Sequence, residues 1–235
     1  MRHIEGAERP DFTREARKGI PEVVLAASKS DEQVMAIARA FVDRGGHVLI
    51  SRLRPATAER LLAEFGAEYV ELRGEARAAA VHAPGYLRPE TGGRVGVVTA
   101  GTGDIPVAEE ARLVAEEMGC EVSSVFDVGV AGIHRLFDPL RELIEHDVAA
   151  LVVVAGMDGA LPSVVAGLSP VPVIGVPTSI GYGAGGRGRA ALLSMLQTCV
   201  PGLVVVNIDN GVGAGATAAL IANRVAEARK TPSHM

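Results

Sequence analysis

Apolar runs without polar alternation recur along the second half of the chain. They cover Arg94–Thr99, Glu121–Phe126, Val148–Val154, Val171–Val176 and Leu203–Val206. Each run is followed by a loop and then by a segment with helical spacing. Strands buried on both faces are typical of parallel sheets, and right-handed crossovers place helices on both sides of such a sheet. The pattern predicts a parallel, doubly wound α/β domain over residues 91–235.

The first third of the chain predicts a small α/β domain over residues 1–90. Strand-like runs lie at Pro21–Ala27, His47–Ser51 and Ala67–Leu72. Ser30 is suited to cap a helix that ends near Arg44, and Pro55 begins a second helix. The segment Ala83–Gly93 contains two prolines and three glycines. Because these residues interrupt regular structure, we interpret this segment as the linker between the domains.

Glycine-containing loops directly follow four strands of the larger predicted domain. Their sequences are TAGTGD, VAGMDG, VPTSIGYG and NIDNG. In open α/β sheets, ligands bind outside the carboxyl ends of the strands, where glycine lets the backbone approach a phosphate. The loops therefore predict a phosphate-bearing small molecule as ligand. Neither a P-loop nor the standard dinucleotide fingerprint is present, so a different set of loops must hold it.

The composition of the chain favours a folded protein with a hydrophobic core over a nucleic-acid-binding, secreted or membrane protein. Hydrophobic residues make up 48% of the 235 positions, which is enough for a sizeable core. The formal net charge of -5 gives no electrostatic reason to expect nucleic-acid binding. The two cysteines read as free thiols in a reducing compartment. The N-terminal residues have no apolar signal region, and no apolar run is long enough to span a membrane. We expect a soluble, cytoplasmic protein.

Several side chains at or after strand ends could carry chemistry, and each also has a structural interpretation. Cys199, at the predicted end of a helix, could be a nucleophile or a small buried hydrophobic residue. Asp158 could be a general base or could cap the following helix, and Asp104 has the same two readings. Asp127 could bind ribose hydroxyls or cap a turn, and His134 could donate to a phosphate. No cluster has zinc-ligand spacing, so the sequence assigns no metal ligands.

Long motifs across the chain resemble the LarB family of nickel-pincer nucleotide cofactor biosynthesis. They are REARKGIPEVVLAASKSDEQV, TAGTGDIPVAEEA, DVGVAGIHRL, VVVAGMDGALPSVVAGL, PVIGVPTSIGYGAGGRGRAALLSML and CVPGLVVVNIDNGVGAG. The resemblance implies a C-terminal domain similar to the aminoimidazole ribonucleotide (AIR) carboxylases and mutases. It further implies a flavodoxin-like sheet and assembly into an octamer.

The resemblance also implies an activity. Members of the family add CO2 to C5 of the pyridinium ring of nicotinic acid adenine dinucleotide and hydrolyse its phosphoanhydride, with Mg²⁺ expected on the pyrophosphate or AMP. The products are pyridinium-3,5-biscarboxylic acid mononucleotide and AMP. The family's cysteine nucleophile corresponds to Cys199 and its loop carboxylate to Asp158. The implied substrate-binding residues are Gly101, Thr102, Asp104, Asp127, His134, Gly156, Ala160, Leu161, Pro162, Thr178, Ser179, Tyr182 and Gly183.

Two departures from the family pattern bear on efficiency. The family usually has Glu at the position of Asp158, so the carboxylate here is shorter by one methylene. It usually has Ser at the position of Gly103, so one hydroxyl is lost. These departures leave a non-catalytic nucleotide-binding relative as one alternative.

An AIR carboxylase or mutase is the other alternative. Those enzymes carry a proton-shuttling histidine in a pattern like AGxAAHLPG. The corresponding position here is Ala160, in AGMDGALPS. Without that imidazole the mutase mechanism lacks its acid, which favours the first interpretation.

Overall fold

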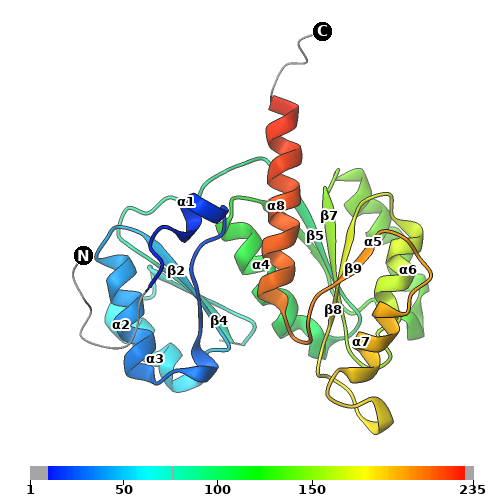
Figure 1. Cartoon of the computed structure of the whole chain (residues 1–235), viewed down its shortest axis with the longest axis horizontal. Helices are drawn as coiled ribbons and strands as arrows, with labels where there is room; N and C mark the ends of the chain where they lie inside the picture. The colour runs from blue at the N-terminus through cyan, green and yellow to red at the C-terminus, as the bar shows by residue number, and fades with distance from the viewer. Residues whose placement is uncertain (1–9, 76, 231–235) are drawn as a thin grey trace. The chain divides into compact units, whose positions relative to one another are not determined.

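The computed structural model describes residues 10–75 and 77–230. The chain divides between Arg88 and Pro89 into two compact units, and this point lies inside the Ala83–Gly93 segment. We describe each unit by itself (Figure 1).

The N-terminal unit contains a four-stranded mixed sheet. Its strands are β1 (Val23–Leu25), β2 (His47–Ser51), β3 (Val70–Arg73) and β4 (Ala78–His82), in the order β1-β2-β4-β3. Its helices are α1 (Arg14–Lys18), α2 (Asp31–Val42) and α3 (Pro55–Phe65), with a 3₁₀ turn η1 at Ala26–Ser28. β1 and β2 are parallel, whereas β4 runs antiparallel to both of its neighbours.

The antiparallel strand β4 was not predicted from the sequence. Its residues are AAAVH, and alanine is depleted in strands, so the local pattern does not favour a strand. In the structure the first four residues of β4 are buried between β2 and β3, where small side chains fit. The predicted strand Ala67–Leu72 also begins too early, because β3 starts at Val70.

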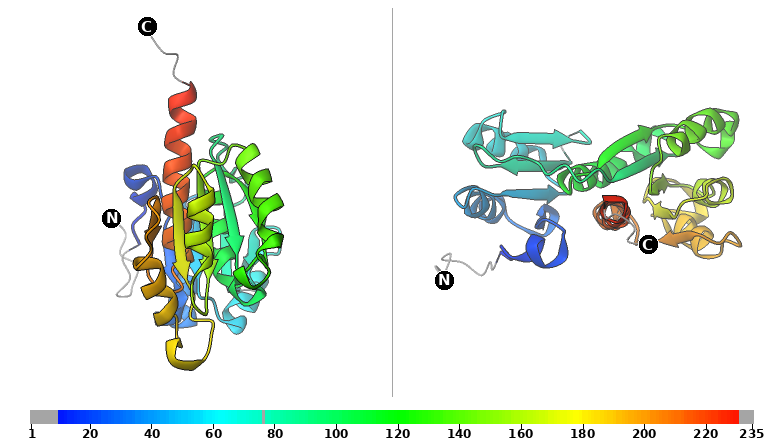
Figure 2. Two further views of the ribbon diagram at one scale, coloured as in Figure 1. Left: turned by 90° about the vertical axis from the view of Figure 1, so that its right-hand side faces the viewer. Right: turned by 90° about the horizontal axis from the view of Figure 1, so that it is seen from above.

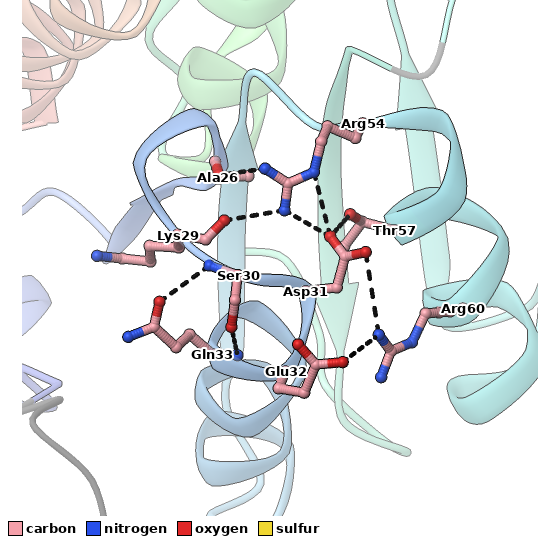
Figure 3. A network of polar contacts seen from close by, with 9 residues as sticks. All are labelled: Ala26, Lys29, Ser30, Asp31, Glu32, Gln33, Arg54, Thr57 and Arg60. Carbon is pink, nitrogen blue, oxygen red and sulfur yellow. Dashed lines mark hydrogen bonds and ion pairs between the residues drawn. The ribbon is translucent and has the colours of Figure 1, made fainter.

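A polar network fills the carboxyl ends of the two parallel strands of this unit (Figure 3). Arg54 donates to the carbonyls of Ala26 and Lys29 and to the Asp31 carboxylate, which also accepts from Thr57. These hydrogen bonds, from Thr57 first and then Arg54, lower the pKa of Asp31. Ser30 forms the capping box of α2 with Gln33. The loops that follow β1 and β2 are therefore joined to each other through the side chains of Arg54, Asp31 and Thr57.

The C-terminal unit is a parallel five-stranded sheet, which confirms the predicted fold class. Its strands are β5 (Arg94–Thr99), β6 (Glu121–Val125), β7 (Ala150–Ala155), β8 (Val173–Pro177) and β9 (Leu203–Val205). Their order is β6-β5-β7-β8-β9, and all pairs are parallel. Counted within this unit, the order is 2-1-3-4-5, the flavodoxin-like arrangement.

Helices cover both faces of this sheet (Figures 1 and 2). The helices are α4 (Ile105–Glu117), α5 (His134–Glu145), α6 (Leu161–Leu168), α7 (Arg189–Leu196) and α8 (Gly211–Lys230), with 3₁₀ turns η2 (Thr102–Asp104), η3 (Val130–Gly132) and η4 (Gly183–Gly185). On one face, α5, α6 and α7 share an apolar core that includes Leu136, Leu161 and Met195. α4 and α8 pack against each other on the other face. The helix near Cys199 is shorter than predicted, because α7 ends at Leu196.

Candidate functional site

A cavity of about 410 Å³ opens among the loops that follow strands β5 to β8. Its lining is mostly backbone and small apolar side chains, with two carboxylates. The lining residues are Ala100, Gly101, Gly103, Asp104, Gly129, Val130, Ala131, Ala155, Gly156, Met157, Asp158, Ala160, Leu161 and Ile180. The cavity lies where parallel α/β sheets bind ligands, at the carboxyl edge of the strands.

Asp104 fixes the loop after β5. Its side chain makes no capping bond to α4; Oδ1 accepts from Thr178 Oγ1 at 2.6 Å, and Oδ2 accepts from the Gly101 N–H at 3.0 Å. Asp104 is 3% exposed, and burial raises its pKa, against the opposing effect of these hydrogen bonds. The carboxylate therefore joins the loop after β5 to the end of β8 and presents a buried acid at the cavity.

Asp158, in the loop after β7, is less buried and less hydrogen-bonded than Asp104. It is exposed, and its Oδ1 accepts from the Ala160 N–H at 3.4 Å, at the edge of hydrogen-bond range. No side chain caps α6, so Asp158 is not its N-cap. The backbone on either side is left-handed, with φ of 52° at Met157 and 63° at Gly159. This turn holds the carboxylate at the cavity with little of its hydrogen-bonding capacity used.

Ile180 bridges the loops after β5 and β7. Its carbonyl accepts from the Met157 N–H at 2.9 Å. Its side chain packs over Gly103, where an added Cβ would lie 3.2 Å from Ile180 Cγ2. The absence of a side chain at Gly103 therefore matters for packing, because a serine there would press on Ile180.

Cys199 is exposed and is not among the residues that line the cavity. The interpretation of Cys199 as a small buried residue is therefore wrong. Its predicted place at the end of a helix is also wrong, because α7 already ends at Leu196. The adjacent residue Thr198 anchors its segment, because Thr198 Oγ1 accepts from Ser163 Oγ at 2.9 Å and from the Val200 N–H at 3.2 Å. Ser163 belongs to α6, the helix that directly follows the Asp158 loop. The chain segment that carries Cys199 is thus tied to that helix, whereas Cys199 itself is exposed.

The second thiol, Cys120, is buried and donates to Asn223 Oδ1 at 3.1 Å. Burial raises its pKa to about 11. A thiol that stays protonated in this way is a poor nucleophile.

Two further aspartates, Asp127 and Asp209, lie in loop turns, and their side chains accept hydrogen bonds from neighbouring residues. Asp127 has a left-handed φ of 59°, and its Oδ2 accepts from Arg135 Nη1 at 2.8 Å. Asp209 has φ of 56°, and its Oδ1 accepts from the Ser179 N–H at 2.8 Å. Both side chains shape the loops in which they lie.

The structure brings some of the predicted site residues to the cavity and leaves others outside its lining. The lining contains Gly101, Asp104, Gly156, Asp158, Ala160 and Leu161. Outside it lie Thr102, Asp127, His134, Pro162, Thr178, Ser179, Tyr182, Gly183 and Cys199. Of these, Thr178 acts through its bond to Asp104, whereas His134 and Tyr182 are exposed.

From the segment after β6, the sequence predicted Asp127 and His134 as site residues but not the residues between them that line the cavity. These are Gly129, Val130 and Ala131, in a loop that was not among the four predicted ligand-binding loops. The signal was present, because GVAG follows an apolar strand as the other loops do. Met157 and Ile180 were also missed, since apolar loop residues carry no chemical signature.

Among residues 10–75 and 77–230, no group of three or more His, Cys, Asp or Glu side chains is placed to hold a metal ion. The same residues include no helix with the length and apolarity that crossing a bilayer requires.

Comparisons with known proteins cover both units. Residues 94–233 match the family model described as AIR carboxylase, and residues 3–83 match that of the LarB/PurE-like N-terminal domain. An uncharacterized protein of Methanocaldococcus jannaschii is 43% identical over 224 residues, which are 93% of this chain and 85% of that protein. N5-carboxyaminoimidazole ribonucleotide mutases of M. jannaschii and Thermotoga maritima are 34% and 32% identical over 127 and 135 residues. Each alignment covers 54% of this chain and 74% of the mutase.

Proposed function

This chain belongs to the LarB family, in which a LarB/PurE-like N-terminal domain precedes an AIR carboxylase domain, and we propose that it carboxylates nicotinic acid adenine dinucleotide. In this proposal CO2 is added at C5 of the pyridinium ring, and the phosphoanhydride is hydrolysed. The products are pyridinium-3,5-biscarboxylic acid mononucleotide and AMP, for use in nickel-pincer cofactor synthesis.

The choice of this activity over that of an AIR-type mutase rests on Ala160, which lines the cavity. A mutase of the AIR type needs a histidine at this position, and here a methyl group lines the cavity instead. The ionisable side chains among the described lining residues are Asp104 and Asp158. A cavity lining without histidine favours a reaction in which a carboxylate, rather than an imidazole, transfers the proton. The nucleophile must then be a residue outside the lining.

The thiol makes the ring reactive. A pyridinium ring is electron-poor and cannot attack CO2. Addition of the Cys199 thiolate forms a C–S bond and moves an electron pair onto the ring nitrogen, which gives a neutral, enamine-like dihydropyridine. C5 then attacks CO2, and loss of the C5 proton with expulsion of the thiolate restores the aromatic ring. The exposure of Cys199 supports this role, because the sulfur must be accessible to the ring.

Asp158 is proposed as the base. It would accept the C5 proton or activate the water that cleaves the phosphoanhydride, and its exposed carboxylate with one long hydrogen bond is free for either step. Asp104, buried and doubly hydrogen-bonded, is suited to hold the loop after β5 in place.

Mg²⁺ is proposed to enter with the substrate. The described residues offer no cluster of three ligands, and oxygen atoms of the pyrophosphate are good ligands for this ion. Bound there, Mg²⁺ would neutralise phosphate charge.

We further propose that the protein assembles into an octamer. Apolar side chains are exposed on α7 and on the edge strand β9: Leu193 and Leu196 are each 62% exposed, and Val204 is 54% exposed. Subunit association would cover these side chains, which lie close in sequence to Cys199.

The test is a product assay. The purified chain is incubated with nicotinic acid adenine dinucleotide, bicarbonate and Mg²⁺, and the products are identified by mass spectrometry. We expect AMP and the dicarboxylated mononucleotide, and we expect that Cys199→Ser abolishes carboxylation while Cys120→Ser retains it. Absence of product from folded protein would contradict the enzyme proposal and favour a non-catalytic nucleotide-binding relative. Full activity of Cys199→Ser would exclude the covalent route.

A second candidate is N5-carboxyaminoimidazole ribonucleotide mutase activity. It is favoured by the similarity of this chain's C-terminal unit to proteins of that name. The same preparation should be assayed with that ribonucleotide. Turnover there, without carboxylation of the dinucleotide, would replace the first proposal.

A further inference from the structure

Cys199 lies in the turn between α7 and β9, and both ends of this turn are held by the apolar core. Met195, in the last turn of α7, is fully buried in that core. Val200 and Leu203, on the other side of Cys199, are half-buried and pack against the same core. Cys199 itself is exposed between these anchors. The thiol of the proposed mechanism is therefore carried by a turn whose two ends are fixed.

A single hydroxyl oxygen fixes the backbone on both sides of Cys199. Thr198 Oγ1 accepts from the Val200 N–H at 3.2 Å and from Ser163 Oγ at 2.9 Å. The first of these bonds closes a turn around Cys199, because a threonine hydroxyl can bond its own backbone two residues further on. Both bonds are partly buried, so water competes with them less than it does at the surface.

The bond from Ser163 attaches this turn to the helix that begins at the cavity. Ser163 is the third residue of α6, and the first residue, Leu161, lines the cavity. Two residues of α-helix span only about 3 Å along the helix axis. Leu161 and Pro162 are buried, which holds this end of α6 in place. The loop after β7 and the turn with Cys199 are thus attached to the same first turn of α6.

The proposed addition to the pyridinium ring demands a well-placed sulfur. The thiolate donates an electron pair to a ring carbon, the C–S bond forms, and a ring electron pair moves onto the ring nitrogen. Such a step needs the two reacting atoms about 3–3.5 Å apart in the correct direction, and a misplacement of about 1 Å can cost about 100-fold in rate. An exposed thiol on a mobile loop would seldom meet this requirement.

We propose that Thr198 and Ser163 are positioning residues for the Cys199 thiol. Thr198 holds the backbone around Cys199 through its hydroxyl oxygen, and Ser163 fixes that hydroxyl to α6. This inference rests on the proposed function, since it assumes that Cys199 adds to the pyridinium ring. Neither hydroxyl touches the reacting atoms in this proposal, and both act through the cysteine that lies between their contacts.

The experiment measures two rates for Cys199 in the whole chain. The first is the rate of ring addition with nicotinic acid adenine dinucleotide, without bicarbonate, followed by the near-ultraviolet absorbance of the dihydropyridine. The second is the rate of Cys199 alkylation by iodoacetamide, followed by mass spectrometry of its peptide. The first reaction depends on the direction of approach, whereas the small reagent can reach an exposed thiol from many directions.

Removal of the Thr198 hydroxyl should affect only the first rate. Thr198→Val keeps the shape of the side chain and should slow ring addition about 10- to 100-fold, with alkylation unchanged. Thr198→Ser keeps the hydroxyl and should retain both rates. Ser163→Ala should slow ring addition by a smaller factor than Thr198→Val, because the bond from the Val200 N–H remains.

Ser169→Ala is the matched control. Ser169 follows the other end of α6, and its Oγ accepts from the Val171 N–H at 3.3 Å, a hydroxyl-closed turn of the same kind. Its loss should change neither rate. Circular dichroism and thermal unfolding verify that each variant is folded.

The outcomes separate this inference from the proposed function. A wild-type rate of ring addition in Thr198→Val would overturn the inference, as would a parallel loss of alkylation or a failure of Thr198→Ser to retain ring addition. Ring addition that depends on Thr198, without carboxylated product in the assay above, would support the inference and contradict the proposed activity. Carboxylated product without any dependence on Cys199 would support the activity and overturn the inference.

Discussion

Two carboxylates, Asp104 and Asp158, line one cavity, and they differ in burial and in hydrogen bonding. Asp104 is 3% exposed and accepts hydrogen bonds from Thr178 and Gly101. Its burial raises its pKa, so ionisation at that site is disfavoured in the folded protein. Asp158 is exposed and accepts a single long bond. At the scale of the residue, Asp104 in the loop after β5 is held in place by its hydrogen bonds, whereas the carboxylate of Asp158 in the loop after β7 can still bind other groups.

The length of the Asp158 side chain gives a prediction. Asp158→Asn should lower kcat about 10²- to 10⁴-fold, the usual contribution of a positioned base. Asp158→Glu should keep or raise activity, because it restores the reach of the residue that the family usually carries. Initial rates of AMP release and of carboxylation would measure both steps. If the asparagine variant keeps the wild-type rate in both, Asp158 is not the base.

At the scale of elements, close contact between helices α4 and α8 depends on small residues. Ala111, Ala214 and Ala218 are fully buried in this contact region. Gly215 lies on Ala111, so that an added Cβ would meet the Ala111 carbonyl oxygen and lie 2.8 Å from its Cα. The two helices can approach this closely only because no side chain separates their backbones.

This contact predicts the effect of one methyl group. Gly215→Ala should lower the free energy of unfolding by about 1–3 kcal/mol, as overpacking does, despite the better helix propensity of alanine. Gly167→Ala is the matched control: Gly167 is exposed in helix α6 with no atom within 4 Å of an added Cβ, and its change should be neutral or stabilising. Denaturant unfolding of both variants measures the difference. An unchanged Gly215→Ala stability would show that the helices can separate at little cost.

At the scale of the whole molecule, the cavity and the thiol are not joined within one chain. Cys199 is exposed outside the lining, while Asp158 is part of it. The bond between Ser163 and Thr198 keeps the cysteine segment against the helix after the Asp158 loop. A covalent mechanism therefore needs a rearrangement within the chain or a thiol supplied by another subunit.

Mixing two inactive variants decides between these. If the site is shared between subunits, Cys199→Ser and Asp158→Asn chains that are unfolded and reassembled together should regain activity. Random assembly would restore up to about a quarter of the sites. Size-exclusion chromatography with light scattering should give about eight times the chain mass of 24.3 kDa. An active monomer, or no activity after mixing, would place the whole site in one chain.

Local pattern in the sequence determined most of the elements. The apolar runs predicted β2 and β5 with their observed bounds, and Ser30 and Pro55 marked the starts of α2 and α3. Helix caps, turns and strand periodicity involve neighbours in the chain, so sequence alone carries them. The alanine-rich strand β4 was not predicted, because its burial between two strands outweighs the weak strand propensity of alanine.

Only the tertiary structure decided which loops meet. Asp104 and Thr178 are 74 positions apart and share a hydrogen bond, Ile180 packs over Gly103, and the loop after β6 completes the cavity. These contacts follow from strand order, which is set by the packing of the whole sheet and leaves no local signature. The exposure of Cys199 likewise depends on the tertiary structure and has no local signature in the sequence. Sequence identified the thiol and the Asp158 carboxylate as candidates, and the fold showed that one chain does not bring them into the same cavity lining.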